Sequence, residues 1–263
     1  MAERSAHNRS VIGSTPIGPI LFFMAENRIL IFKIKKLLDS KINAEYLKKV
    51  RVFIPSDKKI VGVRVPDIRL LVNEFQSKNK LTLEECLNLI DSIVKEQVRE
   101  ELLFGFFLLA KYKKQIKEDI IGKVDGWINY IENWETCDQL ATVINFLFAQ
   151  NTKLLKILDK WSKSENFWRR RFVLAVCSTL NHKGNSSIHN DDSIVDEVLK
   201  ICQNLITDSE EMVEKALHWA IRETSKKDPE KVLQFLLKNK NKMKPRIVKE
   251  SAKKLPEKMK AIL

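Results

Sequence analysis

The chain is poor in residues that interrupt regular structure. Its 263 residues include 7 glycines and 7 prolines, and no segment alternates apolar and polar residues convincingly over several positions. The one ambiguous segment, residues 50–65, is interpreted as a loop. Because the rest of the chain is rich in leucine, lysine, isoleucine and glutamate, which favour helices, we predict an all-α fold.

Cysteine is also scarce, and the pattern of its 4 residues excludes several kinds of site. They lie far apart, with no C-x-x-C pair and no histidine at ligand spacing, and each falls in an apolar helical pattern. Buried, reduced thiols are therefore expected in place of a disulfide or zinc site. This predicts an intracellular protein (cytoplasm and nucleoid, or nucleus in a eukaryote) with no metal and no other cofactor.

No apolar run is long enough to cross a bilayer, so no membrane association is expected. Residues 17–25 are apolar but interrupted by Gly18 and Pro19, and arginines before them leave a signal peptide as an alternative. We predict that residues 1–23 are a disordered N-terminal extension, with Met24 as an alternative start. Residues 24–263 are then a single domain.

Amphipathic patterns follow one another past residue 24, with short breaks between them. The predicted helices span residues 26–39, 43–50, 67–77, 83–94, 96–112, 114–131, 136–149, 151–162, 167–181, 191–205, 210–225, 228–239 and 245–254. Arg99, Asp138, Arg171 and Lys215 take comparable places in successive helix pairs, at spacings of 39, 33 and 44 residues. Such spacings are typical of HEAT-like two-helix repeats, which stack into a curved solenoid with a concave inner face.

The net charge of +13 points to an anionic partner, most simply nucleic acid. A general bias toward lysine is the alternative, but the charge is not uniform. Residues 226–260 carry 13 lysines and arginines against 4 acidic residues. This distribution favours contact with phosphate groups and predicts a basic concave face.

Helical wheels separate a second set of residues from the core. The core stripes are Leu140, Val143, Ile144 and Leu147 in one helix, Val173, Val176, Cys177 and Leu180 in the next, and Val213, Ala216, Leu217, Ala220 and Ile221 in the third. Asp138, Arg171 and Trp219 project away from these stripes. An acid or arginine there can simply be solvated, whereas an exposed tryptophan more often marks a contact surface.

The motifs around these residues resemble the signature of AlkD-type DNA alkylation repair glycosylases. The matching segments are Asn133-Trp134-x-x-x-Asp138, Asn166-x-Trp168-x-x-Arg171, Lys215-Ala-x-x-Trp219-x-x-Arg222-Glu223, and residues 61–69, 111–114 and 245–256. The resemblance spans residues 28–256 in order. It implies a HEAT-like fold and hydrolytic excision of cationic alkylpurines, such as 3-methyladenine and 7-methylguanine, from duplex DNA in base excision repair.

The resemblance also implies roles for individual residues. Trp134 and Trp219 would be aromatic walls, Asp138 the catalytic carboxylate, and Arg171 the cation that orients it and meets phosphate. The expected DNA contacts are Arg222, Lys215, Arg170 and the aromatic Phe53. The expected partner is double-stranded DNA containing alkylated bases, bound by a monomer without an obligate protein partner. Two alternatives stay open: a catalytically silent protein that binds distorted or branched DNA, and a protein-interaction scaffold.

Overall fold

The computed structural model of the protein describes residues 19–54, 56–180 and 193–263. These residues form α-helices and two short 3-10 helices, and they contain no strand. The α-helices are α1 (Pro19–Asp39), α2 (Ala44–Phe53), α3 (Val65–Asn79), α4 (Leu83–Glu96), α5 (Arg99–Ala110), α6 (Ile121–Ile128), α7 (Trp134–Gln150), α8 (Leu155–Trp161), α9 (Phe167–Leu180), α10 (Ser193–Gln203), α11 (Glu211–Thr224), α12 (Pro229–Asn239), α13 (Pro245–Ala252) and α14 (Glu257–Lys260). The 3-10 helices are η1 (Glu118–Ile120) and η2 (Thr152–Leu154).

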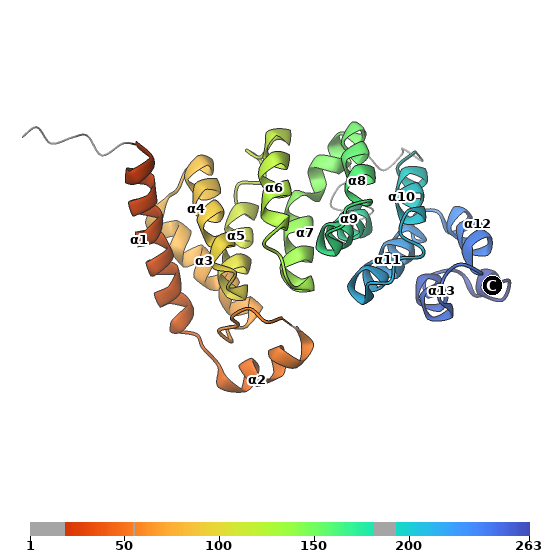
Figure 1. Ribbon diagram of the computed structural model, residues 1–263, viewed down its shortest axis with the longest axis horizontal. Helices are drawn as coiled ribbons and strands as arrows, with labels where there is room; N and C mark the ends of the chain where they lie inside the picture. Colours follow the sequence, from red (N-terminus) through yellow and green to blue (C-terminus); the bar gives the residue numbers. More distant parts are fainter. Residues whose placement is uncertain (1–18, 55, 181–192) are drawn as a thin grey trace, which may run out of the picture.

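The helices stack as two rows, which confirms the predicted all-α helical-repeat fold. In Figure 1, α4, α6, α8, α10 and α12 form the upper row, and α5, α7, α9, α11 and α13 form the lower row. Along the lower row, each helix packs against the next. Matched positions on successive lower-row helices therefore lie along one surface.

Helix α9 is the centre of this row, because it packs against both α7 and α11. Every residue from Arg171 to Leu180 is buried. The three predicted core stripes are buried as well. However, Arg171 lies on the face expected to be solvated and is only 5% exposed. A wheel describes one isolated helix, and it cannot show that neighbours cover α9 on two sides.

Most predicted helix bounds lie within about three residues of the observed ones, and the exceptions are the starts of α1, α6 and α8. The predicted helices correspond to α1–α13, and α14 was not predicted. Thr82 forms a capping box with Glu85 at the start of α4. Helix α1 begins at Pro19, inside the range expected for the N-terminal extension, and residues 1–18 lie outside the described residues. The loop prediction for residues 50–65 is too wide, because residues 50–53 belong to α2 and Val65 begins α3, whereas residues 56–64 contain no helix.

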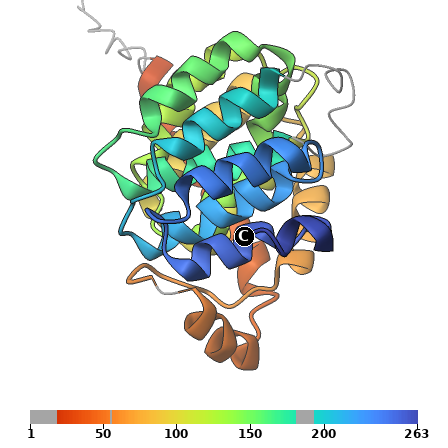
Figure 2. The same ribbon diagram turned by 90° about the vertical axis from the view of Figure 1, so that its right-hand side faces the viewer.

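Helix α2 stands apart from the two rows, beneath the lower row in Figure 1 and at the bottom of Figure 2. Its apolar contacts form a small cluster around Val50, Ile54 and Ile60, against which Trp134 also packs. The chain that leads from α2 to α3 passes through Gly62. Its φ is 95°, a conformation that is unfavourable for residues other than glycine. A Cβ atom there would lie 2.7 Å from the Leu47 Cβ, so this close approach requires glycine.

Helix α2 and residues 56–64 after it are here called the arm. A buried ionic cluster connects the arm to the array of helices. The Glu100 carboxylate accepts hydrogen bonds from the backbone N–H groups of Val61 at 2.8 Å and Gly62 at 2.9 Å. Arg99 donates to Glu100 at 2.8 Å, to Glu135 at 2.7 Å and to the Tyr46 hydroxyl at 3.2 Å. Arg99 is 1% exposed. The cluster thus links α2, α5 and the first turn of α7, where the predicted site begins.

The remaining sequence predictions concern cysteines and membranes. All four cysteines are buried and free, as predicted. Among the helices of the described ranges, none is both long enough and apolar enough to span a membrane.

Candidate active site

Asp138 and Arg171 meet across the contact between α7 and α9. The Arg171 guanidinium donates to both carboxylate oxygens of Asp138, with Nε–Oδ1 at 3.0 Å and Nη2–Oδ2 at 2.8 Å. Its remaining terminal nitrogen donates to the backbone oxygen of Met212 at 2.6 Å. The guanidinium plane is therefore fixed between α9, α7 and the start of α11, and it fixes the carboxylate in turn.

This pair lies in an open cleft of about 590 Å³ on the lower row of helices. The lining residues come from α7, α9, α11 and α13; they are Trp134, Asp138, Arg171, Lys215, His218, Trp219, Arg222, Arg246 and Glu250. The structure thus brings together all four residues predicted to be catalytic. Four cationic side chains against two carboxylates give the cleft a positive balance.

Contacts with neighbouring groups fix the positions of Trp134 and Trp219. Asn133 caps α7 by accepting from the Thr136 N–H at 2.9 Å, so Trp134 begins the helix. The Trp134 indole N–H donates to the Phe53 backbone oxygen at 3.0 Å. Trp219 lies on α11 and is half-buried against the main core. Both rings are therefore held in place, and both face the cleft.

A second hollow of about 440 Å³ adjoins the first and shares Trp134, Arg171 and Lys215 with it. Its other wall includes Val52 and Phe53 at the end of α2, which are 78% and 71% exposed. Phe53, predicted from the resemblance, therefore lies beside the cleft with its ring facing solvent. Exposed apolar side chains next to a basic cleft indicate a contact surface.

The electrostatic setting differs between Asp138 and His218, both of which line the cleft. Burial raises the pKa of Asp138, and the ion pair with Arg171 works against that rise. Burial also lowers the pKa of His218 to about 4, helped by the positive charge of Arg222. His218 is therefore neutral at pH 7, and its buried Nδ1 has no hydrogen-bond partner among the described residues.

The other predicted DNA contacts separate into two groups. Lys215 lines both hollows and pairs with Glu211 at 2.8 Å, and Arg222 lies 3.8 Å from Glu250. Arg170 is placed differently. Its guanidinium pairs with Asp208 at 2.6 Å and donates to two backbone oxygens, and it does not line either hollow. Arg170 thus ties the start of α9 to the loop before α11, and we leave it out of the proposed DNA contacts.

Asp208 lies just before the start of α11. The N-cap residue is Glu210, and no side chain caps it. Asp208 accepts from the Glu210 N–H at 3.0 Å and binds the Arg170 guanidinium.

Sequence reasoning missed three residues of the cleft: His218, Arg246 and Glu250. Arg246 belongs to the basic C-terminal third, which was the available signal for it. His218 and Glu250 had no signal, because their place depends on how α13 packs against α11. Within the described ranges, no group of three or more histidine, cysteine, aspartate or glutamate side chains could hold a metal ion.

Solved structures with a similar arrangement come from two bacteria. A protein of Enterococcus faecalis, described as a predicted DNA alkylation repair enzyme, is 18% identical, with a TM-score of 0.69 over 82% of this chain and 98% of that one. AlkD2 from Streptococcus mutans is 19% identical, with a TM-score of 0.54 over 80% of this chain and 99% of that one. No curated protein matches significantly. At these identities the likeness establishes the fold: the chain is an AlkD-like helical-repeat protein.

A match at the level of sequence families goes further. The model of the family described as DNA alkylation repair enzyme matches residues 34–255. The chain therefore belongs to the DNA alkylation repair enzyme family, as the sequence motifs indicated.

Proposed function

We propose that this protein is a DNA glycosylase that excises positively charged alkylpurines, such as 3-methyladenine and 7-methylguanine, from duplex DNA. One observation carries the proposal: Asp138 is clamped by Arg171 in an open, basic cleft that also holds Trp134 and Trp219. Family membership and the basic charge support DNA as the substrate.

The reaction needs few catalytic groups because the alkylated base is already a good leaving group. Alkylation at N3 or N7 makes the purine cationic, so the base leaves as a neutral molecule with the electron pair of the C1′–N bond. Positive charge then develops on the sugar, and water adds its oxygen to C1′ while losing a proton. The Asp138 carboxylate can stabilise that charge and orient the water. One preorganised electrostatic group of this kind is worth about 3–4 kcal/mol.

Arg171 and the tryptophans assist in different ways. Arg171 orients Asp138 and favours its ionised form, since each carboxylate oxygen accepts one guanidinium N–H. Trp134 and Trp219 offer ring faces to the cationic sugar, and each such contact contributes about 0.5–2 kcal/mol. No side chain in this set supplies a general acid: His218 is neutral at pH 7 and Asp138 is paired. A neutral lesion such as uracil should therefore be refused.

The cleft is open and not enclosed, which suits recognition of the lesion while the base stays in the duplex. Most glycosylases place the flipped base in a closed pocket instead. Under this proposal Lys215, Arg222 and Phe53 contact the DNA around the lesion, and the protein works as a monomer in base excision repair.

Release of 7-methylguanine from alkylated duplex DNA by the purified protein tests the proposal. Release of 7-methylguanine without release of uracil from a matched duplex is the expected result. Tight binding without release would instead assign a silent DNA-binding role. Failure of both release and binding would leave only a protein-interaction scaffold.

A further inference from the structure

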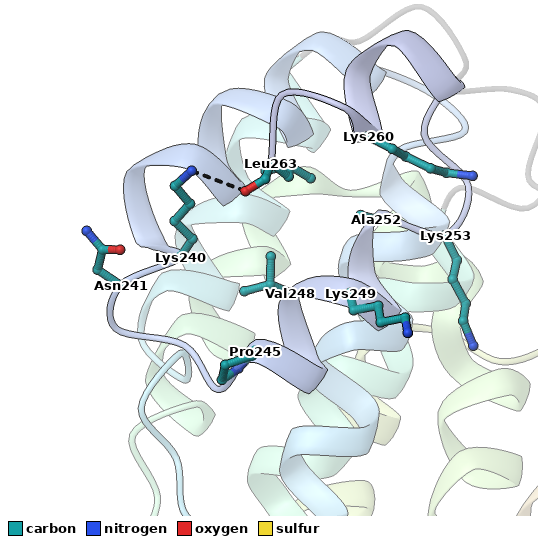
Figure 3. A pocket seen from close by; sticks show the side chains of 9 residues that line it. All are labelled: Lys240, Asn241, Pro245, Val248, Lys249, Ala252, Lys253, Lys260 and Leu263. Atoms are coloured by element: carbon teal, nitrogen blue, oxygen red, sulfur yellow. Dashed lines mark hydrogen bonds between the residues drawn. The ribbon is translucent and has the colours of Figure 1, made fainter.

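Another pocket, of about 560 Å³ and here called the C-terminal pocket, lies between the turn after α12, helix α13 and the C-terminal residues (Figure 3). Its apolar floor is formed by Pro245, Val248, Ala252 and Leu263. Four lysines surround this floor: Lys240, Lys249, Lys253 and Lys260. In Figure 3, Lys240 lies on one side of the floor, and the other three lie on the opposite side.

The lysine charges are only partly neutralised. Lys253 pairs with Glu250 at 2.7 Å, and Lys260 pairs with Glu257 at 2.7 Å. Lys240 donates to the main-chain oxygen of Leu263 at 3.2 Å. Neither Lys240 nor Lys249 pairs with an aspartate or glutamate of the described residues. The pocket therefore keeps a net positive charge and suits an anionic ligand.

The pocket and the candidate active site lie on two sides of one helix. Helix α13 contributes Arg246 and Glu250 to the cleft, and Val248 and Lys249 to the pocket. Glu250 stands between the two surfaces, since it approaches Arg222 of the cleft and pairs with Lys253 of the pocket. The width of a helix, about 10 Å, separates them. Along the axis of a DNA duplex, one strand covers that distance in about three nucleotides, at a rise of roughly 3.4 Å per phosphate.

We propose that this pocket binds the sugar–phosphate backbone of the DNA about three nucleotides beyond the lesion. Lysine ammonium groups meet the phosphates, and the apolar floor meets the C–H faces of the deoxyribose. Among the residues described as lining it, none offers an aromatic ring on which a base could stack. The contact is therefore independent of sequence. It rests on the DNA-binding part of the proposed function and does not require base release.

The first test removes Lys240 and Lys249, the two pocket lysines that pair with no aspartate or glutamate of the described residues. We expect Lys240→Gln/Lys249→Gln to weaken binding of a long undamaged duplex by about tenfold and to lower the salt slope by about two units. The control is Lys95→Gln/Lys156→Gln, which removes two exposed lysines from α4 and α8 of the upper row. It should bind as the unchanged protein does.

The second test locates the contact with duplexes that carry one neutral methylphosphonate in place of a phosphate. A methylphosphonate about three nucleotides from the lesion should weaken the unchanged protein and leave the Lys240/Lys249 variant unaffected. Equal sensitivity of both proteins at every position would overturn the proposal. So would an unchanged affinity of the variant combined with binding of inorganic phosphate to the pocket, which would assign it to a small anion.

Base release measured on the same samples separates this inference from the proposed activity. A protein that releases no base but shows the mapped phosphate contact contradicts the glycosylase proposal alone. Normal release without a mapped contact contradicts the pocket proposal alone.

Discussion

At the scale of single residues, Asp138 and Arg171 depend on each other. Burial alone would favour a protonated, uncharged Asp138, and the guanidinium counteracts this by pairing with both oxygens. Arg171 in turn is 5% exposed and needs the carboxylate to balance its charge. The proposed catalytic charge is thus maintained by a residue that itself need not touch the substrate.

Replacing Arg171 with glutamine should shift the pH dependence of base release. Because Arg171 lowers the pKa of Asp138, its removal raises that pKa, and the carboxylate protonates at higher pH. We expect the acid limb of the single-turnover pH profile to move up by about one unit or more. Arg222→Gln is the matched control, since Arg222 lines the same cleft without contacting Asp138. An acid limb that stays in place in Arg171→Gln would contradict the assigned role.

Glu101 makes a residue-scale prediction about stability. Burial raises the pKa of Glu101 to about 7, and its Oε2 has no partner among the described residues. A raised folded-state pKa favours folding below the unfolded value near 4.5, and this advantage is lost as the pH rises through 7. Glu101→Gln does not titrate, so it should gain stability relative to the unchanged protein between pH 5 and pH 8, by at most about 3 kcal/mol. Urea unfolding at both pH values measures the change, and a constant difference would argue against it.

At the scale of elements, the Arg99 cluster is one of the contacts that hold α2 to the array. Arg99→Ala leaves the buried carboxylate of Glu100 and the half-buried carboxylate of Glu135 without their cation. We expect a loss of about 3–5 kcal/mol in the free energy of unfolding. Arg64→Ala, which breaks an exposed pair with Asp67, should cost less than about 1 kcal/mol. Similar losses in the two variants would mean that the cluster is not what secures the arm.

The elements themselves could be predicted because their signals are local. The 3.6-residue period marks the buried stripes of α7, α9 and α11, and Thr82 and Glu85 identify the start of α4. The path of the arm could not be predicted in this way. It depends on bonds from Arg99 and Glu100 to residues about 37–53 positions away along the chain.

Local motifs predict part of the candidate site, whereas contacts between residues far apart in the chain determine the rest. Trp134, Asp138, Arg171 and Trp219 stand at fixed places in motifs, and the structure brings them into one cleft. Arg170 and Arg171 are adjacent, and the sequence does not show which one faces the cleft. Asp208 determines which arginine this is, because it lies 38 residues after Arg170 and binds it, so Arg171 faces the cleft.

At the scale of the whole molecule, the positive charge should make DNA binding strongly dependent on salt. Phosphate neutralisation releases counterions, so the affinity for duplex DNA falls steeply as salt rises. Arg222→Ala should weaken binding similarly for all sequences and reduce the salt slope by about one unit. Lys95→Ala, on the upper row, should leave the slope unchanged. Fluorescence anisotropy over a salt series measures both, and an affinity independent of salt would exclude a phosphate-based mode.

The most direct measurement is the single-turnover release of 7-methylguanine by the Asp138→Asn variant. Asparagine keeps the size and hydrogen-bonding capacity of aspartate but removes the charge that faces the sugar cation. We expect release to fall by about 10²–10³-fold, while duplex binding stays unchanged or tightens slightly. Trp219→Ala, measured in parallel, should lose less rate because a cation–π contact is weaker. An Asp138→Asn variant with full activity on 7-methylguanine would contradict the proposed mechanism.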